Sequence, residues 1–374
     1  MRYFLIKNCR IIGFEGETND ILIANDKIIA IGKSLARPTV DTHELVANGC
    51  VAIPGRVNVN SQFTSLNTKE ELTDEVHKDV TGGYTTWMAP ALPSEMADTL
   101  AKYETQIDST LNYSLHFSID KFKHGDLNKI RSMASPNGMP TIYYTLRTPQ
   151  AAYNDRLDLY IETASKYNLT IVVNIVKECG SEEHLKSLEM MCKRLADTEC
   201  RTLFTNVRFN EELNCITRLH DTNKAVNAQI CYDICRQGMS EMKEFTGKEF
   251  VDMLRGNDWL CGDVFGQNNT SDNKARQKEL TSAAHLIKEY GLSGEEAVEY
   301  LTTRICRYLG LTPEKGLIKV GSDADICIIN PHAINGQPTD EDIIKAVFIS
   351  GEMVYSEGTI QNNIRGKLAF RRIF

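Results

Sequence analysis

Residues 53 to 63 read IPGRVNVNSQF, an apolar run, a Pro-Gly pair and a second short run. This pattern predicts a β-strand that enters the protein core after a turn. The strand ends in Asn60-Ser61-Gln62, where a functional site would be expected to carry charged or metal-binding side chains. The predicted strand therefore ends in two neutral amides at a position where a functional site is expected.

The composition favours a globular protein. The 374 residues are 42% hydrophobic and carry a net charge of -8, without a run rich in Lys and Arg, which argues against nucleic-acid binding. No stretch approaches about 18 consecutive apolar residues, and MRYFLIKNCR lacks a signal-peptide pattern, so neither a membrane span nor secretion is expected. Eleven scattered cysteines, mostly in apolar runs, predict reduced, buried thiols and a cytoplasmic location.

The chain alternates between two kinds of pattern. Residues 1–53 and 311–374 consist of short β-like runs and turns, and predict one composite β-sandwich domain built from both chain ends. Residues 54–310 alternate β-like runs with helical patterns, which is typical of an α/β fold, here a (β/α)8 TIM barrel with its chemistry at the C-terminal strand ends. The eight runs are IPGRVNVN, TTWMAPAL, NYSLHFSI, PTIYYTL, TIVVNIV, RTLFTNV, AVNAQICYDI and WLCGDVFG.

Three motifs resemble the amidohydrolase superfamily, specifically its cyclic-amide branch of dihydroorotases and dihydropyrimidinases. IPGRVNVNSQF is similar to the entry strand of the family, in which an H-x-H pair stands near the end. DVTGGYTTWMAPAL, at 79–92, is similar to the segment A-x-x-G-G-x-T-T-x-x-x-M-P-N. KGLIKVGSDADICIINP, at 315–331, is similar to the ending K-G-x-I-x-x-G-x-D-A-D. The resemblance covers nearly the whole chain.

The resemblance implies one or two zinc-like metals that generate hydroxide from bound water at neutral pH. In the family, an H-x-H pair, a carboxylated Lys, two further His and an Asp bind them. None of the eight histidines of this chain falls at the corresponding strand ends, and we expect no metal or other cofactor. The matching positions are Asn60 and Gln62 on the first strand, Tyr143 on the fourth, Asn174 on the fifth, Asn206 on the sixth and Asp263, the retained acid, on the eighth.

These replacements predict a hydrogen-bonded pocket lined by the same six residues. Amide oxygens are weak ligands for zinc-like metals, but amides can donate to and accept from one another. Asp263 then needs a partner, a raised pKa or water, and Arg56 and Arg208 are candidate partners near predicted strand ends. Dihydroorotases bind the substrate carboxylate through an Arg and an Asn. The corresponding positions of this chain are Thr64 and Ala91, so we expect this recognition of a carboxylate to be lost.

Three functions are consistent with this pattern. The leading hypothesis is a homologue without metal-dependent cyclic-amide hydrolysis, with a structural, regulatory or ligand-binding role linked to pyrimidine metabolism. Some bacteria keep an inactive dihydroorotase-like chain that assembles with aspartate transcarbamoylase, so a comparable partner, or self-association into an oligomer, is expected. The alternative is a divergent hydrolase of cyclic-amide C–N bonds, with Asp263 as general base and Tyr143, Asn60 and Asn206 orienting the substrate. The third is a barrel that binds a small polar metabolite without a protein partner.

Overall fold

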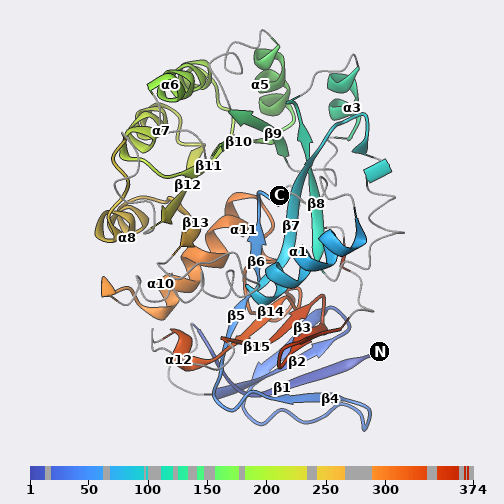
Figure 1. Cartoon of the computed structure of the whole chain (residues 1–374). Helices are drawn as coiled ribbons and strands as arrows, with labels where there is room; N and C mark the ends of the chain where they lie inside the picture. The colour runs from blue at the N-terminus through green and yellow to red at the C-terminus, as the bar shows by residue number, and fades with distance from the viewer. Residues whose placement is uncertain are drawn as a thin grey trace.

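The computed structural model describes residues 1–12, 18–61, 68–96, 98–99, 111–120, 125–133, 141–146, 156–176, 182–233, 242–265, 289–334, 343–361, 366–367 and 369. Two sheets organise these residues, one curled inside a ring of helices and one beside it (Figure 1). Within this part of the chain, no helix is both long and apolar enough to span a membrane.

The first sheet confirms the predicted barrel. Each of the eight sequence runs contains one strand, and neighbouring strands in the order β13-β12-β11-β10-β9-β8-β7-β6 are parallel. The strands are β6 (Arg56–Asn58), β7 (Tyr84–Ala91), β8 (Asn112–Ser118), β9 (Thr141–Leu146), β10 (Thr170–Ile175), β11 (Thr202–Val207), β12 (Val226–Asp233) and β13 (Leu260–Phe265).

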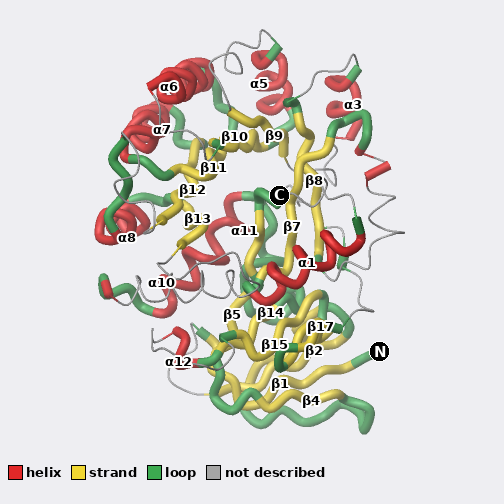
Figure 2. Tube along the Cα trace, viewed as in Figure 1, coloured by secondary structure: helices red, strands yellow, loops and turns green. Residues whose placement is uncertain are grey.

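Helices cover the outer side of this sheet (Figure 2). In α6, Leu188, Met191 and Leu195 share one face and are fully buried, while acidic residues begin the helix and basic residues end it. The helices that follow the strands are α1 (Lys69–Thr81), α3 (Asp126–Met133), α5 (Leu157–Lys166), α6 (Glu182–Ala196), α7 (Asn210–Thr222) and α8 (Gly247–Gly256).

The curled sheet has a seam between β6 and β13, which are its two ends and do not pair with each other in the described strands. Three short helical segments follow β13, namely α10 (Gly294–Val298), the π-helical turn η3 (Glu299–Thr303) and α11 (Arg304–Tyr308). The turn η3 contacts both β6 and β13, so this connection packs along the seam (Figure 1).

The lower part of the barrel interior is a packed core. Inward side chains such as Met88, Val172 and Leu203 form one buried cluster with Ile305 and Leu309 from α11 and its C-terminal end. Because these apolar layers fill the barrel at that depth, open space for a site remains toward the C-terminal ends of the strands.

The second sheet joins the two chain ends, as the strand patterns predict. Strand β5 pairs antiparallel with β14, and the order is β17-β16-β15-β14-β5-β1-β2-β3, with β4 on β1. Its elements are β1 (Tyr3–Ile11), β2 (Thr18–Ala24), β3 (Lys27–Gly32), β4 (His43–Val46), β5 (Val51–Pro54), β14 (Ile326–Ile329), β15 (Ile344–Ile349), β16 (Glu352–Ser356) and β17 (Thr359–Ile360), with α12 (Pro331–Ile334) after β14.

Gly55 is the point at which the chain passes from one sheet to the other, between β5 and β6. A Cβ atom at this position would lie 2.1 Å from Oγ1 of Thr85 on β7. The Gly55 N–H donates to the carbonyl of Asp325 at 2.9 Å. Glycine is therefore required at position 55 by close packing between the two sheets.

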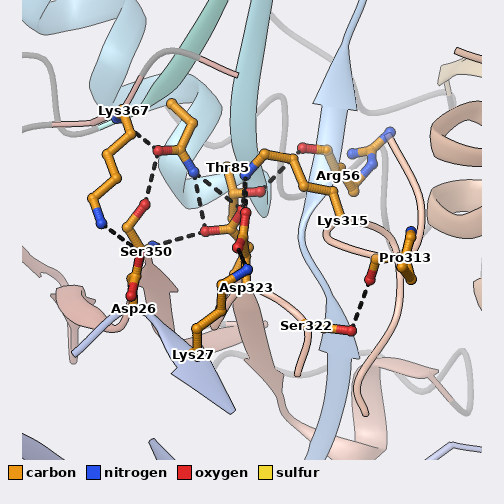
Figure 3. A network of polar contacts seen from close by, with 12 residues as sticks. Asp26, Lys27, Arg56, Thr85, Pro313, Lys315, Ser322, Asp323, Ser350 and Lys367 are labelled. Carbon is orange, nitrogen blue, oxygen red and sulfur yellow. Dashed lines mark hydrogen bonds and ion pairs between the residues drawn. The ribbon is translucent and has the colours of Figure 1, made fainter. Parts of the chain in front are cut away.

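A buried polar network lies at this junction and explains the KGLIKVGSDAD motif (Figure 3). Asp325 accepts hydrogen bonds from Nζ of Lys315, from Nδ2 of Asn112 at 3.0 Å and from the Ser350 N–H at 2.7 Å. Asp323 lies 3.2 Å from the same ammonium. Burial alone would lower the pKa of Lys315, but the two carboxylates outweigh it and raise that pKa above its ordinary value. The motif therefore links the sheets, away from the C-terminal strand ends.

The described end of the chain is held on the same junction. The Tyr113 N–H donates to the Lys367 carbonyl at 3.0 Å, and the Ala369 N–H donates to the Tyr113 carbonyl at 2.7 Å. The Lys367 N–H donates to Oδ1 of Asn112 at 2.8 Å. A Cβ atom on Gly366 would lie 1.7 Å from the carbonyl oxygen of Leu111, so glycine is needed where the tail lies against β8.

Candidate functional site

Three of the predicted amides meet at the barrel mouth. Nδ2 of Asn206 donates to Oδ1 of Asn174 at 2.7 Å. The hydroxyl of Thr205 lies between strands and can donate to Oδ1 of Asn60 at 3.2 Å or to Oδ1 of Asn174 at 3.4 Å. Hydrogen bonds thus join side chains from β10, from β11 and from the segment that follows β6. We call these residues, Asn60, Asn174, Thr205 and Asn206, the amide cluster.

A β-bulge directs Asn206 into this cluster. Its φ of 64° is left-handed, a conformation that Asn tolerates better than most residues. The pairing of β11 with β12 shifts between Phe204 and Val207, so that Asn206 lies in the irregular part of the strand. Bulges re-aim side chains, and here the bulge turns Asn206 toward Asn174 on the neighbouring strand.

A second set of contacts fixes the end of β6. Oδ1 of Asn58 accepts a hydrogen bond from the Asn60 N–H at 3.1 Å, and Nδ2 of Asn58 donates to Oδ2 of Asp79 at 2.9 Å. The indole N–H of Trp87 donates to the same oxygen of Asp79, a fully buried residue of α1. Asn58 therefore links the Asn60 backbone to the buried carboxylate of Asp79.

Tyr143 lies one layer deeper than its predicted place in the pocket. On β9, Tyr143 is level with Val172 of β10, whereas Asn174 is level with Thr145. Tyr143 is buried with Val172 in the apolar barrel core and is not among the residues that line the cavity described below. Thr145 is therefore the β9 residue at the level of the amide cluster, and its N–H donates to Oδ1 of Asp120 at 2.7 Å.

His116 on β8 fills the barrel beside Tyr143, with ring centroids 5.2 Å apart. Nε2 of His116 is 2.9 Å from the Val59 carbonyl, and Nδ1 is hydrogen-bonded to the Thr141 hydroxyl. Complete burial lowers the pKa of His116 to about 4. The ring is therefore a neutral packing element at physiological pH.

A cavity of about 360 Å³ opens beside the amide cluster. It lies along the seam, since its lining includes residues at the end of β6, on β13 and on η3 and α11. The buried hydroxyl of Ser61 lines it and has no hydrogen-bond partner among the described residues. The polar and charged residues that line it are Arg56, Asn58, Asn60, Ser61, Glu75, Tyr84, Asn174, Asn206 and Gln229.

Two predicted pocket residues cannot be placed in this cavity. Gln62 lies outside the described residues, and Asp263 belongs to β13, but its side chain is outside the described part of the structure. Arg56, one expected partner of Asp263, lines the cavity, donates to the Gly82 carbonyl at 3.2 Å and stacks over Tyr84 at 4.1 Å. The pairing of Asp263 with either arginine stays a prediction.

Arg208, the other expected partner, follows β11 directly and is buried, with 8% of its surface exposed. Its backbone N–H donates to Oε2 of Glu212 at 2.9 Å, and the Phe209 N–H donates to the same oxygen at 3.3 Å. Glu212 thereby orders the turn between β11 and α7.

The amide cluster does not fit the divalent metal that the fold resemblance implies. Oδ1 of Asn174 already accepts from Asn206 and faces the Thr205 hydroxyl, and neutral amide oxygens bind zinc-like ions weakly. Among the described side chains, no three His, Cys, Asp or Glu residues are grouped as metal ligands.

The cysteines are buried thiols for the most part. Of the nine described cysteines, all of them free, only Cys50 is not buried. Burial raises the pKa of Cys306 and Cys327 to about 12, so neither is a nucleophile near pH 7.

Comparisons with known proteins agree with the fold. The Amidohydrolase family profile matches residues 258–354. A 5'-deoxyadenosine deaminase from Methanobrevibacter smithii is 25% identical over 389 aligned positions, covering 89% of this chain and 85% of the relative. A D-hydantoinase from Thermus sp. superposes with a TM-score of 0.74 at 16% identity, covering 99% of both chains. A dihydropyrimidinase from Brevibacillus agri has a TM-score of 0.76 at 14% identity, covering 100% of this chain and 99% of its own.

Proposed function

We propose that this chain, a member of the amidohydrolase superfamily, uses its barrel mouth to bind a small polar molecule without metal-dependent hydrolysis of a cyclic amide. The observation that carries the proposal is the amide cluster, which occupies the strand ends where the family resemblance places metal ligands. Amide side chains that are hydrogen-bonded to one another can exchange those bonds for hydrogen bonds to a ligand.

The polar groups of the amide cluster and Ser61 favour a small cyclic ligand whose ring can donate and accept hydrogen bonds. Asn174 and Asn206 offer carbonyl and N–H groups, and Ser61 offers a buried hydroxyl without a partner among the described residues. A volume of about 360 Å³ suits a single small ring with substituents. Cyclic amides such as hydantoin and dihydrouracil present alternating N–H and C=O groups that match such a lining.

A divergent hydrolase is the second candidate, because β13 retains Asp263 and the relative from Methanobrevibacter smithii is named as a deaminase. In that case Asp263 acts as the general base and the amide cluster orients the substrate. A structural role beside aspartate transcarbamoylase, or within an oligomer of this chain, is compatible with either candidate and concerns other surfaces.

The test combines binding with turnover. Hydantoin, dihydrouracil, dihydroorotate and 5'-deoxyadenosine are titrated by calorimetry, and each is incubated with the protein and analysed by mass spectrometry. The proposal predicts saturable binding of at least one compound without product, and binding about tenfold weaker in Asn174→Ala because one hydrogen-bonding group is lost. Product formation that Asp263→Asn abolishes would instead establish the hydrolase.

Thr145→Val is the matched control for the binding measurement. Thr145 is level with Asn174 on the adjacent strand, but its hydroxyl is committed to Asp120. We therefore expect a smaller loss of affinity from Thr145→Val than from Asn174→Ala. Equal losses would show that general disturbance of the mouth, and not the Asn174 amide, controls binding.

A further inference from the structure

Two cysteines lie side by side where β1 and β5 begin to pair. Cys9 belongs to β1, and Cys50 immediately precedes β5, which runs parallel to β1. The Arg10 N–H donates to the Cys50 carbonyl at 2.9 Å. The Gly49 N–H donates to the Asn8 carbonyl at 2.8 Å. Because these two hydrogen bonds lie on either side of Cys9, they place its backbone directly beside that of Cys50.

Both cysteine side chains lie on the same face of the second sheet. Alternate residues of a strand share a face, so Cys9 lies on the face of Ile11. By the same rule, Cys50 lies on the face of Ala52, which is the direct partner of Ile11. Cys9, Ile11 and Ala52 belong to one buried cluster, and Cys50 packs against that cluster. The two thiols are therefore neighbours on the same apolar core.

A tight turn fixes the backbone of Cys50. Its N–H donates to the Ala47 carbonyl at 2.8 Å, and the intervening Asn48 and Gly49 have φ angles of 49° and 78°. Two successive left-handed residues are typical of a type I′ turn, for which Asn-Gly is a favoured sequence. Neighbouring strands lie about 4.7–4.9 Å apart, and the Cα atoms of disulfide-bonded cysteines lie about 4.4–6.8 Å apart. The backbone therefore holds the two cysteines at a separation that suits a disulfide.

The two thiols differ in their access to solvent. Cys9 is fully buried, and its thiol donates to the Asn19 carbonyl at 3.3 Å. Burial raises the pKa of Cys9 to about 12, so this thiol is protonated near pH 7. Among the described cysteines, Cys50 alone is not buried. Because oxidants react with accessible thiolates, Cys50 is the sulfur that reacts first, and Cys9 is the neighbouring thiol that can attack it afterwards.

We propose that Cys50 and Cys9 are a reversible oxidation site, at which hydrogen peroxide converts the two thiols to a disulfide. The Cys50 thiolate attacks one peroxide oxygen, so that an S–O bond forms and the O–O bond breaks. The leaving hydroxide takes up the proton that Cys50 released and becomes water. The Cys9 sulfur then attacks the sulfur of the Cys50 sulfenic acid, so that an S–S bond forms and the S–O bond breaks. The second hydroxide takes the Cys9 proton, and one peroxide and two thiols have given one disulfide and two waters.

The disulfide has two consequences for the protein. It closes the segment from Cys9 to Cys50, which carries β2, β3 and β4, and this constraint on the unfolded chain stabilises the folded one. It also protects Cys50 from further oxidation to sulfinic and sulfonic acids, which thiol reductants do not reverse. The site lies in the second sheet, and the inference is independent of any ligand at the barrel mouth.

Peptide mapping after peroxide treatment tests this assignment. The purified full-length chain is reduced, treated with hydrogen peroxide, blocked with iodoacetamide and cleaved with Lys-C without further reduction. We expect mass spectrometry to detect residues 8–27 joined to residues 34–69, each of which contains one cysteine. Dithiothreitol should separate the two peptides. The oxidised protein should melt about 3–5 °C above the reduced protein in scanning calorimetry.

Cys50→Ser is the matched variant, because it removes one sulfur at a position that is not fully buried. It should melt within about 1 °C of the reduced wild type, form no joined peptide and show no rise in melting temperature after peroxide treatment. In Cys9→Ala, Cys50 should advance to sulfinic and sulfonic acids at peroxide concentrations that give the disulfide in the wild type. The inference is overturned if wild-type Cys50 stays unmodified, becomes a sulfinic acid without a bond to Cys9, or joins mainly to another cysteine.

Discussion

The substitution Asp325→Asn tests whether the charged C-terminal motif is structural. Asp325 is 4% exposed and faces the ammonium of Lys315, which is 8% exposed. An Asn at this position retains a carbonyl for hydrogen bonding but removes the charge that pairs with Lys315. Removing one partner of a buried ion pair costs about 3–5 kcal/mol. We expect a loss in this range, because the carboxylate that stays near Lys315, that of Asp323 at 3.2 Å, is partly exposed and shared with Lys27.

This cost converts into a measurable change in melting temperature. An unfolding entropy of about 2.1 cal/mol/K per residue gives about 0.8 kcal/mol/K for 374 residues. A loss of about 3–5 kcal/mol should therefore lower the melting temperature by about 4–6 °C. Differential scanning calorimetry of purified wild type and variant measures the shift.

Asp323→Asn is the matched control, since it makes the same chemical change two residues away. The side chain of Asp323 is 21% exposed and pairs with Lys27, which is 36% exposed, and with the Lys315 ammonium at 3.2 Å. Solvent screens the pair with Lys27, and Asp325 still neutralises Lys315 in this variant, so we expect a loss of no more than about 1 kcal/mol, or about 1 °C. The double variant Lys315→Met, Asp325→Asn should recover part of the lost stability because it leaves no stranded charge. Equal melting temperatures for Asp325→Asn and Asp323→Asn would show that the buried charge of Asp325 does not stabilise this junction.

Three further predictions concern the barrel and its junctions. The pKa of the His116 imidazole is about 4 in the folded protein and about 6.5 in the unfolded chain. Between pH 6.5 and 4, only the unfolded chain binds a proton at this ring. The free energy of unfolding therefore falls as the pH decreases through this range. The loss should reach about 3 kcal/mol in urea unfolding and be absent in His116→Phe; the same loss in that variant would contradict the assignment. Gly55→Ala should cost about 1–3 kcal/mol through the clash with Thr85, and Thr85→Ala should recover part of it; a fully additive double variant would show that the clash is not the cause. Gly366→Ala should expose the C-terminal segment to limited proteolysis because the Leu111 carbonyl leaves no room for Cβ, and unchanged cleavage would contradict this placement.

Sequence patterns were sufficient for the architecture. The alternation of β-like and helical segments located all eight strands of the barrel sheet, and the strand patterns at both chain ends predicted the second sheet. These features depend on local periodicity, which a single sequence records directly.

The layers inside the barrel were harder to predict. Tyr143 was expected at the mouth, but inter-strand register places Thr145 there, and register depends on pairing with β10 and not on the strand's own sequence. Counting two residues onward along the alternating strand would have identified Thr145. Asn206 turns inward because its φ is left-handed and the pairing of β11 with β12 is irregular at this residue. No sequence pattern specified either feature. The burial of Arg208 likewise emerges only from the three-dimensional structure.

Zinc binding distinguishes an amide-lined barrel mouth from a metal site. Purified protein is dialysed against excess zinc and then against buffer, and metal content is measured by inductively coupled plasma mass spectrometry. The triple variant Asn60→His, Asn174→His, Asn206→His, which restores imidazoles at three positions of the family pattern, serves as the comparison. We expect the wild-type chain to retain far less than one zinc per chain and the triple variant to retain more. One tightly bound zinc per wild-type chain, lost in Asn174→Ala, would contradict it.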